Sequence, residues 1–304
     1  MTTNNSLALY FTRASRFLSH GGWKRVSLLF DDAQKDFVNS WEGIYQEFQS
    51  KPHEAPIAAK KLIASEPLAT ALVLAMARSD AGELFVRYKR FLEFILRQSE
   101  ALAGYLAVAA IPHVEAGFLY MAASVMSFHW EAWGLFEKLL TTKFEWYYQS
   151  GRAIFSYPFD LPYLFHSEAL GRSAPNIHDL FREELADPQI GLVTSLERNH
   201  AIDVYVQTQF LMCLKVAQLR ESGEHLDIWP DFGRFYGDRI ARLLDRIYGD
   251  SDFAGGLLRV FGEDRQTFFA RLNDRLRVIQ AVFWRGSPYI YESLSSWEPR
   301  ETHA

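Results

Sequence analysis

The sequence predicts an all-α protein, and three observations lead to this prediction. Apolar residues recur at steps of three and four along most of the chain, which is the spacing of one helix face. In residues 264–284, for example, Phe268, Leu272 and Leu276 share a face. Prolines and glycines separate these periodic stretches. The alternation typical of strands is convincing only in residues 152–159.

We expect about ten helices in two packed halves, residues 1–150 and 151–304, which meet in a segment rich in proline and aromatic residues. One continuous domain and a degenerate array of helical hairpins are the alternative arrangements. The expected helices cover residues 4–18, 24–49, 55–77 with an interruption near Pro67, 82–110, 112–128, 130–151, 194–222, 231–248, 252–261 and 264–284.

Local signals justify the ends of these helices. Gly21 interrupts the first helical pattern, and Pro112 suits the first turn of a new helix. Thr194 and Glu197 have the spacing of a capping box, in which each side chain satisfies a free backbone amide. Gly223 is a natural stop for the helix that follows. Because this helix is apolar on most faces, we expect it to be the most buried element.

Composition excludes several classes of protein. The formal net charge is -5, and the eleven arginines between Arg220 and Arg285 are balanced by eleven acids. A nucleic-acid-binding protein usually has a basic excess on one face, so the sequence gives no strong signal for a nucleic-acid partner. Cys213 is the only cysteine, which excludes an intramolecular disulfide and a cysteine-based zinc site.

The sequence also predicts the compartment. The first 20 residues lack the apolar core of a signal peptide, so we expect a cytoplasmic protein. Residues 101–130 are apolar, but Pro112, His113 and Glu115 divide them into runs shorter than the ~20 residues needed to cross a bilayer. We therefore expect no membrane insertion.

A surplus of aromatic residues is the main indication of function. The segment from 130 to 165 is denser in tryptophan, tyrosine and phenylalanine than a core usually requires, and such residues are enriched where proteins bind each other. The sequence therefore predicts a non-catalytic interaction or scaffold protein without a cofactor, one subunit of a larger assembly, that binds another protein or its own copy. The candidate binding residues are Trp130, Trp133, Trp146, Tyr147, Tyr148 and Tyr157.

An all-helical enzyme is the alternative hypothesis. Arg172 and His178 have a spacing that resembles the HEPN ribonucleases, a resemblance that implies action on an RNA 2′-hydroxyl. The adjacent His178 and Asp179 resemble the metal-binding pair of HD-domain phosphohydrolases. A structural interpretation competes with both: Asn176 caps a helix, and His178 lies on its flank one turn from Arg182.

A third pattern lies near the N-terminus. Asp31, Asp32 and Asp36 form a DDxxxD motif that resembles the metal-binding helix of class I terpene synthases. Closely spaced carboxylates on a helix can hold Mg²⁺ against a diphosphate. The alternative is a solvated acidic face beside Lys24, Arg25 and Lys35.

Overall fold

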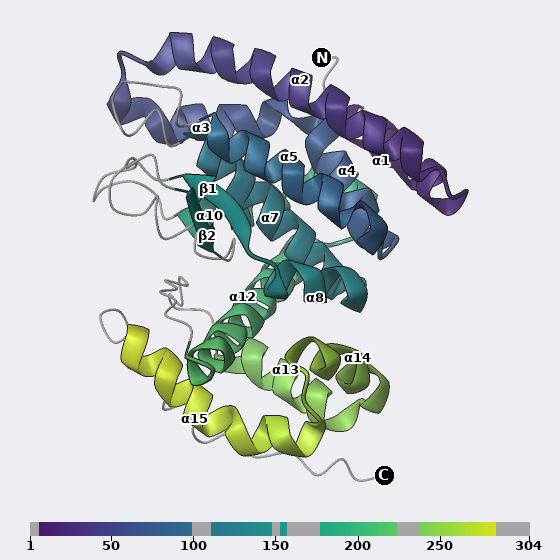
Figure 1. Ribbon diagram of the computed structural model, residues 1–304, viewed down its shortest axis with the longest axis vertical. Coiled ribbons are helices and arrows are strands. Elements are labelled where there is room, and N and C mark those ends of the chain that lie inside the picture. Colours follow the sequence, from purple (N-terminus) through teal and green to yellow (C-terminus); the bar gives the residue numbers. More distant parts are fainter. Residues whose placement is uncertain (1–5, 99–110, 148–152, 157–176, 224–236, 284–304) are drawn as a thin grey trace. The chain divides into compact units, whose positions relative to one another are not determined.

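The computed structural model describes residues 6–98, 111–147, 153–156, 177–223 and 237–283 (Figure 1). Within these residues it contains thirteen α-helices, two short 3-10 helices and a two-stranded antiparallel sheet. The expected all-α class is therefore confirmed. None of the helices in this part of the chain is both long enough and apolar enough to span a membrane.

The chain divides into two compact units, Met1–Ala201 and Ile202–Ala304, which we call the N-terminal unit and the C-terminal unit. The division falls after residue 201, whereas the sequence suggested a boundary near residue 150. The proline-rich residues 157–176, which suggested that boundary, lie outside the described residues.

Helices make up most of the N-terminal unit. The 3-10 helices are Pro52–Glu54 (η1) and Gly82–Leu84 (η2). The α-helices are α1 (Ser6–Ser19), α2 (Trp23–Phe48), α3 (Ala55–Ser65), α4 (Pro67–Arg78), α5 (Phe85–Arg97), α7 (Ile111–His129), α8 (Trp133–Thr141), α10 (Ile177–Leu185) and α11 (Pro188–Thr194). Pro67 begins α4 and separates it from α3, as the sequence predicted, because proline restricts the preceding residue to non-helical conformations.

The core of this unit is built on α4 and α7. All residues of α4 from Leu68 to Ala77 are buried, and so are all residues of α7 from Val114 to Phe128. Helix α4 packs against α1 and α7, and α7 also contacts α3, α5 and α8 (Figure 1). The many alanines of α4 allow its neighbours to approach closely. The expectation that residues 194–222 form the most buried element is therefore wrong, since that segment includes exposed residues at 197–200.

A short sheet replaces the end of the helix expected over residues 130–151. Helix α8 stops at Thr141, and β1 (Phe144–Tyr147) pairs antiparallel with β2 (Ala153–Ser156). The aromatic residues that suggested a helix also fit an extended chain. From β1, Phe144 packs edge-on against Phe85 at 6.2 Å between ring centroids. Strand β2 lies inside the segment 152–159, where the sequence indicated alternation, but its partner strand was missed.

A turn distant in sequence caps the start of α8. Asp80, in the left-handed region at φ 43°, precedes η2. Its carboxylate accepts hydrogen bonds from the amides of Leu135 (2.7 Å) and Gly134 (3.3 Å). Lys138 returns a hydrogen bond to the Gly82 carbonyl at 2.9 Å. The first amides of a helix have no partner within it, so Asp80 acts as an N-cap from another part of the chain.

The C-terminal unit contains most of α12 (Arg198–Glu221), together with α13 (Gly237–Gly249), α14 (Ser251–Phe261) and α15 (Arg265–Phe283). Asp250 caps α14, because its carboxylate accepts hydrogen bonds from the backbone amides of Asp252 and Phe253. Gly262, at φ 65°, ends α14 in the left-handed conformation that glycine adopts easily. Gly223, at φ 87°, follows the end of α12 as the sequence predicted.

The predicted capping box at Thr194 and Glu197 is wrong. Thr194 is the last residue of α11, and Ser195 follows it in a left-handed conformation. The Thr194 hydroxyl donates to the Ile190 carbonyl at 2.8 Å, as a residue inside a helix does. The spacing of the two side chains was that of a cap, but the first of them closes one helix and does not open the next.

Candidate functional site

The turn between α7 and α8 carries two of the predicted binding residues. Glu131 adopts a left-handed conformation at φ 55°, which ends α7 and turns the chain into α8. Trp130 and Trp133 flank it, and both side chains are half-buried. The His129 ring lies 5.8 Å from the Trp130 ring and 5.5 Å from that of the exposed His200. We call His129, Trp130, Trp133 and His200 the aromatic turn.

Packing beneath the aromatic turn holds it in place. Trp133 meets Phe128 and Phe136 at 6.2 Å between ring centroids in both cases, and these two phenylalanines pack on each other at 6.0 Å. Both phenylalanines are buried. Burial lowers the pKa of His129, and nearby His200 lowers it further. The turn thus presents rigid aromatic rings beside a histidine that favours its neutral form.

The other four predicted binding residues are Trp146, Tyr147, Tyr148 and Tyr157, whose side chains are not among those that the structure describes. Trp146 and Tyr147 lie in β1, where the position of the backbone alone is described. Tyr148 and Tyr157 lie outside the described residues.

The predicted catalytic residues separate onto two sides of α10. Arg172 and Asn176 lie outside the described residues, and the helix begins at Ile177. His178 is buried and packs edge-on against Phe181 at 6.5 Å between ring centroids. Asp179 is half-buried and forms an ion pair with Arg182. The sequence placed His178 on the flank of this helix, and the structure buries it because the apolar side of α10 includes it.

The three aspartates of the DDxxxD motif lie on α2. Asp31 pairs with Arg87 of α5, and Asp32 lies 3.5 Å from Lys35 on an exposed face. Asp36 is exposed, and its charge raises the pKa of Glu66. Among the described residues no group of three or more histidines, cysteines or acids has the geometry to hold a metal ion.

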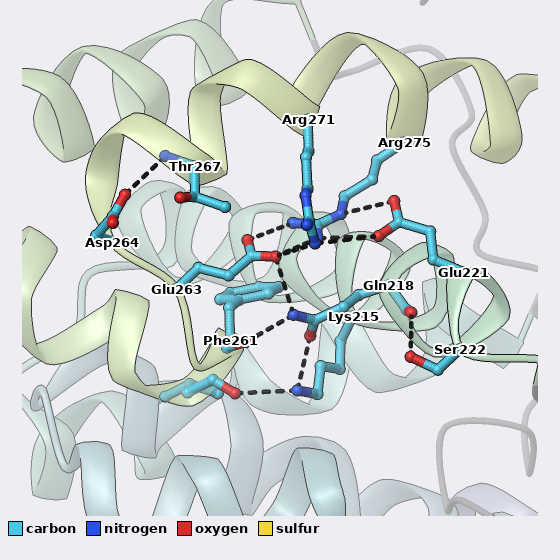
Figure 2. A network of polar contacts seen from close by, with 11 residues as sticks. Lys215, Gln218, Glu221, Ser222, Phe261, Glu263, Asp264, Thr267, Arg271 and Arg275 are labelled. Atoms are coloured by element: carbon cyan, nitrogen blue, oxygen red, sulfur yellow. Dashed lines mark hydrogen bonds and ion pairs between the residues drawn. The ribbon is translucent and has the colours of Figure 1, made fainter.

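The C-terminal unit contains a polar network that the sequence did not predict (Figure 2). Lys215 of α12 is buried, and its ammonium donates to the Val260 carbonyl at 3.0 Å and to Gln218 at 2.8 Å. Gln218 in turn donates to the Phe261 carbonyl at 2.6 Å and to Glu263 at 3.3 Å. Two side chains of α12 thereby satisfy the last carbonyls of α14, which have no partner within that helix.

The centre of the network is Arg275 of α15, whose side chain is fully buried. Its guanidinium donates two hydrogen bonds to Glu221, at 3.1 and 3.2 Å, and two to Glu263, at 2.7 and 2.5 Å. Figure 2 shows the two carboxylates on either side of this guanidinium. The more exposed Arg271 lies 3.3 Å from Glu263. The planar guanidinium of Arg275 therefore binds one carboxylate on each of two sides, and its hydrogen bonds to Glu221 connect α15 to α12.

Pairing sets the charge states of the network. Burial alone would raise the pKa of Glu263, but hydrogen bonds and charge from Arg275 outweigh it and lower that pKa. Burial disfavours the charged form of Arg275, yet its two carboxylate partners raise its pKa. Both groups therefore remain charged at neutral pH and neutralise each other.

An open pocket of about 470 Å³ lies beside the network. Its walls include Lys215, Gln218, Glu221, Ser222, Phe261 and Arg271. The pocket could accept a small polar molecule. Most of its polar groups already bind each other or helix carbonyls, which is typical of a structural brace and leaves little reactivity for catalysis.

The sequence gives no clear signal for this network. Arginine is rarely buried unless it is paired, so residue type alone favours a solvent-facing Arg275. The pairing acids, Glu221 and Glu263, lie 54 and 12 residues away, so the pair is visible only once the chain has folded.

Comparison with known proteins supplies no further guide. No family model, no curated protein and no solved structure gives a significant match to this chain.

Proposed function

We propose that this chain is a non-catalytic helical protein that binds another protein, or a second copy of itself, as one subunit of a larger assembly. The observation that carries the proposal is the aromatic turn. Trp130 and Trp133 lie partly exposed on a turn fixed by buried phenylalanines. Tryptophans held in this way lose little conformational freedom on binding and contribute strongly to interfaces.

The network around Arg275 supports a structural role for the C-terminal unit. Its buried charges connect α12, α14 and α15, and they balance each other. A helical frame braced in this way can present a binding surface of fixed shape. The proposal also assigns the protein to the cytoplasm, because a single buried cysteine suits a reducing compartment.

The experiment compares binding by the full chain and by a Trp130→Ala variant. Partners from the native host are captured on the immobilised wild-type chain, identified by mass spectrometry, purified and titrated against both proteins. Sedimentation equilibrium measures self-association in parallel. We expect the substitution to weaken binding by about tenfold or more, as at other interface tryptophans.

Tyr248→Ala is the matched control, since Tyr248 is an exposed aromatic residue of the C-terminal unit. Circular dichroism verifies that each variant folds. Equal affinity in the wild type and Trp130→Ala would refute the role of the aromatic turn. RNA cleavage or phosphohydrolysis by the purified chain that disappears in His178→Ala, with the fold intact, would replace the proposal by the enzyme hypothesis.

A further inference from the structure

The polar network of the C-terminal unit carries more positive than negative charge. Its charged side chains are those of Lys215, Arg271, Arg275, Glu221 and Glu263. Three of them are cationic and two are acidic. A further acid, Asp264, is used at the start of α15, where it accepts the Thr267 amide at 2.7 Å (Figure 2). The network therefore has one surplus cation.

Two of the three cations have close partners inside the network. Arg275 is fully buried and donates two hydrogen bonds to each of the two acids. It therefore supplies both carboxylates with charged donors. Lys215 is 7% exposed, and its ammonium donates to a backbone carbonyl of α14 and to Gln218. It adds a second positive charge beside the carboxylates, so the two acids are compensated without Arg271.

Arg271 is the surplus cation. Among the described residues its guanidinium makes one hydrogen bond, to Glu263 at 3.3 Å, and it lies 3.9 Å from Glu221. Its side chain is 55% exposed, whereas that of Arg275 is 0% exposed. A guanidinium has five N–H donors in a planar arrangement. Arg271 therefore keeps most of its donors for an acceptor outside the network.

Arg271 forms part of the wall of the open pocket of about 470 Å³. Pockets of this size commonly hold small molecules. Lys215, Gln218 and Ser222 of α12 supply further polar groups to the wall, which also includes one acid, Glu221. That acid already accepts two hydrogen bonds from the buried Arg275. The pocket thus combines room for a ligand with a positive charge that the network does not need.

We propose that this pocket binds a small polar oxyanion, a molecule that carries carboxylate or phosphate groups, and that Arg271 holds it. The planar guanidinium matches two oxygens of such a group, and a charged donor strengthens each hydrogen bond. The ammonium of Lys215 adds positive charge from the wall. A cationic ligand would be repelled by the surplus charge, and a neutral one would gain nothing from it.

Binding of the oxyanion leaves the rest of the network in place. Arg271 exchanges one hydrogen bond of 3.3 Å to Glu263 for hydrogen bonds to the ligand. Glu263 retains its two shorter hydrogen bonds from Arg275, and Gln218 continues to donate to it. The site is therefore ready for the anion without rearrangement of α12, α14 or α15.

This site is independent of the aromatic turn. All residues in the wall of the pocket belong to the C-terminal unit, whereas the aromatic turn belongs to the N-terminal unit. The inference therefore does not rest on the proposed function. A Trp130→Ala variant should weaken partner binding and leave anion binding unchanged, which separates the two proposals.

The test is calorimetric titration of the full chain at pH 7 and low ionic strength with sodium citrate and, separately, with sodium phosphate. Sodium chloride at equal ionic strength is the blank, and glycerol is the uncharged polar probe. Arg271→Gln is the site variant. Arg277→Gln is the matched control, because Arg277 lies on the same helix, is 68% exposed and is not in the pocket wall. Circular dichroism verifies that each variant folds.

We expect saturable binding of one anion per chain, weakened about tenfold or more in Arg271→Gln and by less than about twofold in Arg277→Gln. Arg271→Lys keeps the charge but not the planar donors, so its affinity should lie between those of the wild type and Arg271→Gln. Tighter binding of citrate would identify a carboxylate ligand, and tighter binding of phosphate a phosphate-bearing one.

Three outcomes would overturn the proposal. The first is the absence of saturable binding of both anions, and the second is an equal affinity for glycerol. The third is an affinity in Arg271→Gln that equals that of the wild type or of Arg277→Gln, because the anion would then respond to the overall charge and not to the pocket.

Discussion

Each of the two units buries acidic side chains, and the two sets behave in opposite ways. In the C-terminal unit Glu263 is enclosed with Arg275, and its pKa is lowered. In the N-terminal unit Glu66 is enclosed near other acids, and its pKa is raised to about 8. Both side chains are at most 5% exposed. The comparison shows that the partner of a buried acid, and not burial alone, determines which charge state the fold favours.

The difference also determines how each unit should respond to pH. A buried acid with a raised pKa stabilises the fold at low pH and loses that contribution as pH rises. A buried acid with a lowered pKa stabilises the fold at neutral pH and loses its contribution on acidification. Four measurements test this contrast.

The largest change in the free energy of unfolding with pH should come from the ionisation of Glu66. Below pH 4.5 it is protonated in both the folded and unfolded chain. Between pH 4.5 and about 8 only the unfolded chain ionises it, so the free energy of unfolding falls across this window. At about 1.4 kcal/mol per pKa unit, the loss is on the order of 5 kcal/mol at most. Denaturant titrations at several pH values should show a smaller loss in Glu66→Gln than in the wild type, because the variant retains only the contributions of the other acids with raised pKa values, such as Glu115.

Removing the central arginine should destabilise the C-terminal unit strongly. Arg275→Ala leaves two carboxylates without their buried partner, which typically costs about 3–5 kcal/mol. Arg271→Ala is the matched control, since Arg271 is 55% exposed and its loss should cost less than about 1 kcal/mol. Urea unfolding at pH 7 measures both. Equal losses in the two variants would show that Arg275 is not the centre of the network.

Glu263→Gln tests whether a buried acid with a lowered pKa stabilises the fold at neutral pH and loses that contribution on acidification. It removes charge from hydrogen bonds to a buried arginine, so we expect a loss of about 2–3 kcal/mol at pH 7. The difference from the wild type should shrink as pH falls below 4.5, because the unfolded wild type then gains a proton on Glu263 before the folded chain, with its lowered pKa, does. A difference that grows on acidification would contradict the lowered pKa.

The smallest effect should come from an exposed pair. Lys35 lies 3.5 Å from Asp32, and the two side chains are 74% and 57% exposed. Solvent screens such pairs, so Lys35→Ala should change the free energy of unfolding by less than about 0.5 kcal/mol. Thermal and urea unfolding should agree on this value. A larger loss would mean that pairing matters even without burial.

The sequence predicted helix boundaries that are determined by a single residue at the boundary itself. Pro67 separates α3 from α4, and Pro112 lies in the first turn of α7. The stop after α12 is also local, since Gly223 adopts a positive φ. In each case a single residue type restricts the backbone regardless of its tertiary surroundings.

Elements that depend on distant contacts were missed. Strand β1 forms because it pairs with β2 and buries Phe144 against Phe85. The same aromatic spacing fits a helix, so periodicity alone could not decide between the two structures. Arg275 and His178 are both buried although their residue types favour exposed positions. Their burial depends on partners and on packing that the sequence does not show.

The cap that Asp80 provides for α8 has a consequence for synthesis on the ribosome. Asp80 lies 54 residues before Gly134, whose backbone amide donates a hydrogen bond to its carboxylate. At roughly 5–20 residues per second, it emerges about 3–10 s before that amide does. We therefore expect α8 to be stabilised late, on a surface that the earlier helices have already formed, and synonymous codon changes between the two positions should alter the yield of native chain.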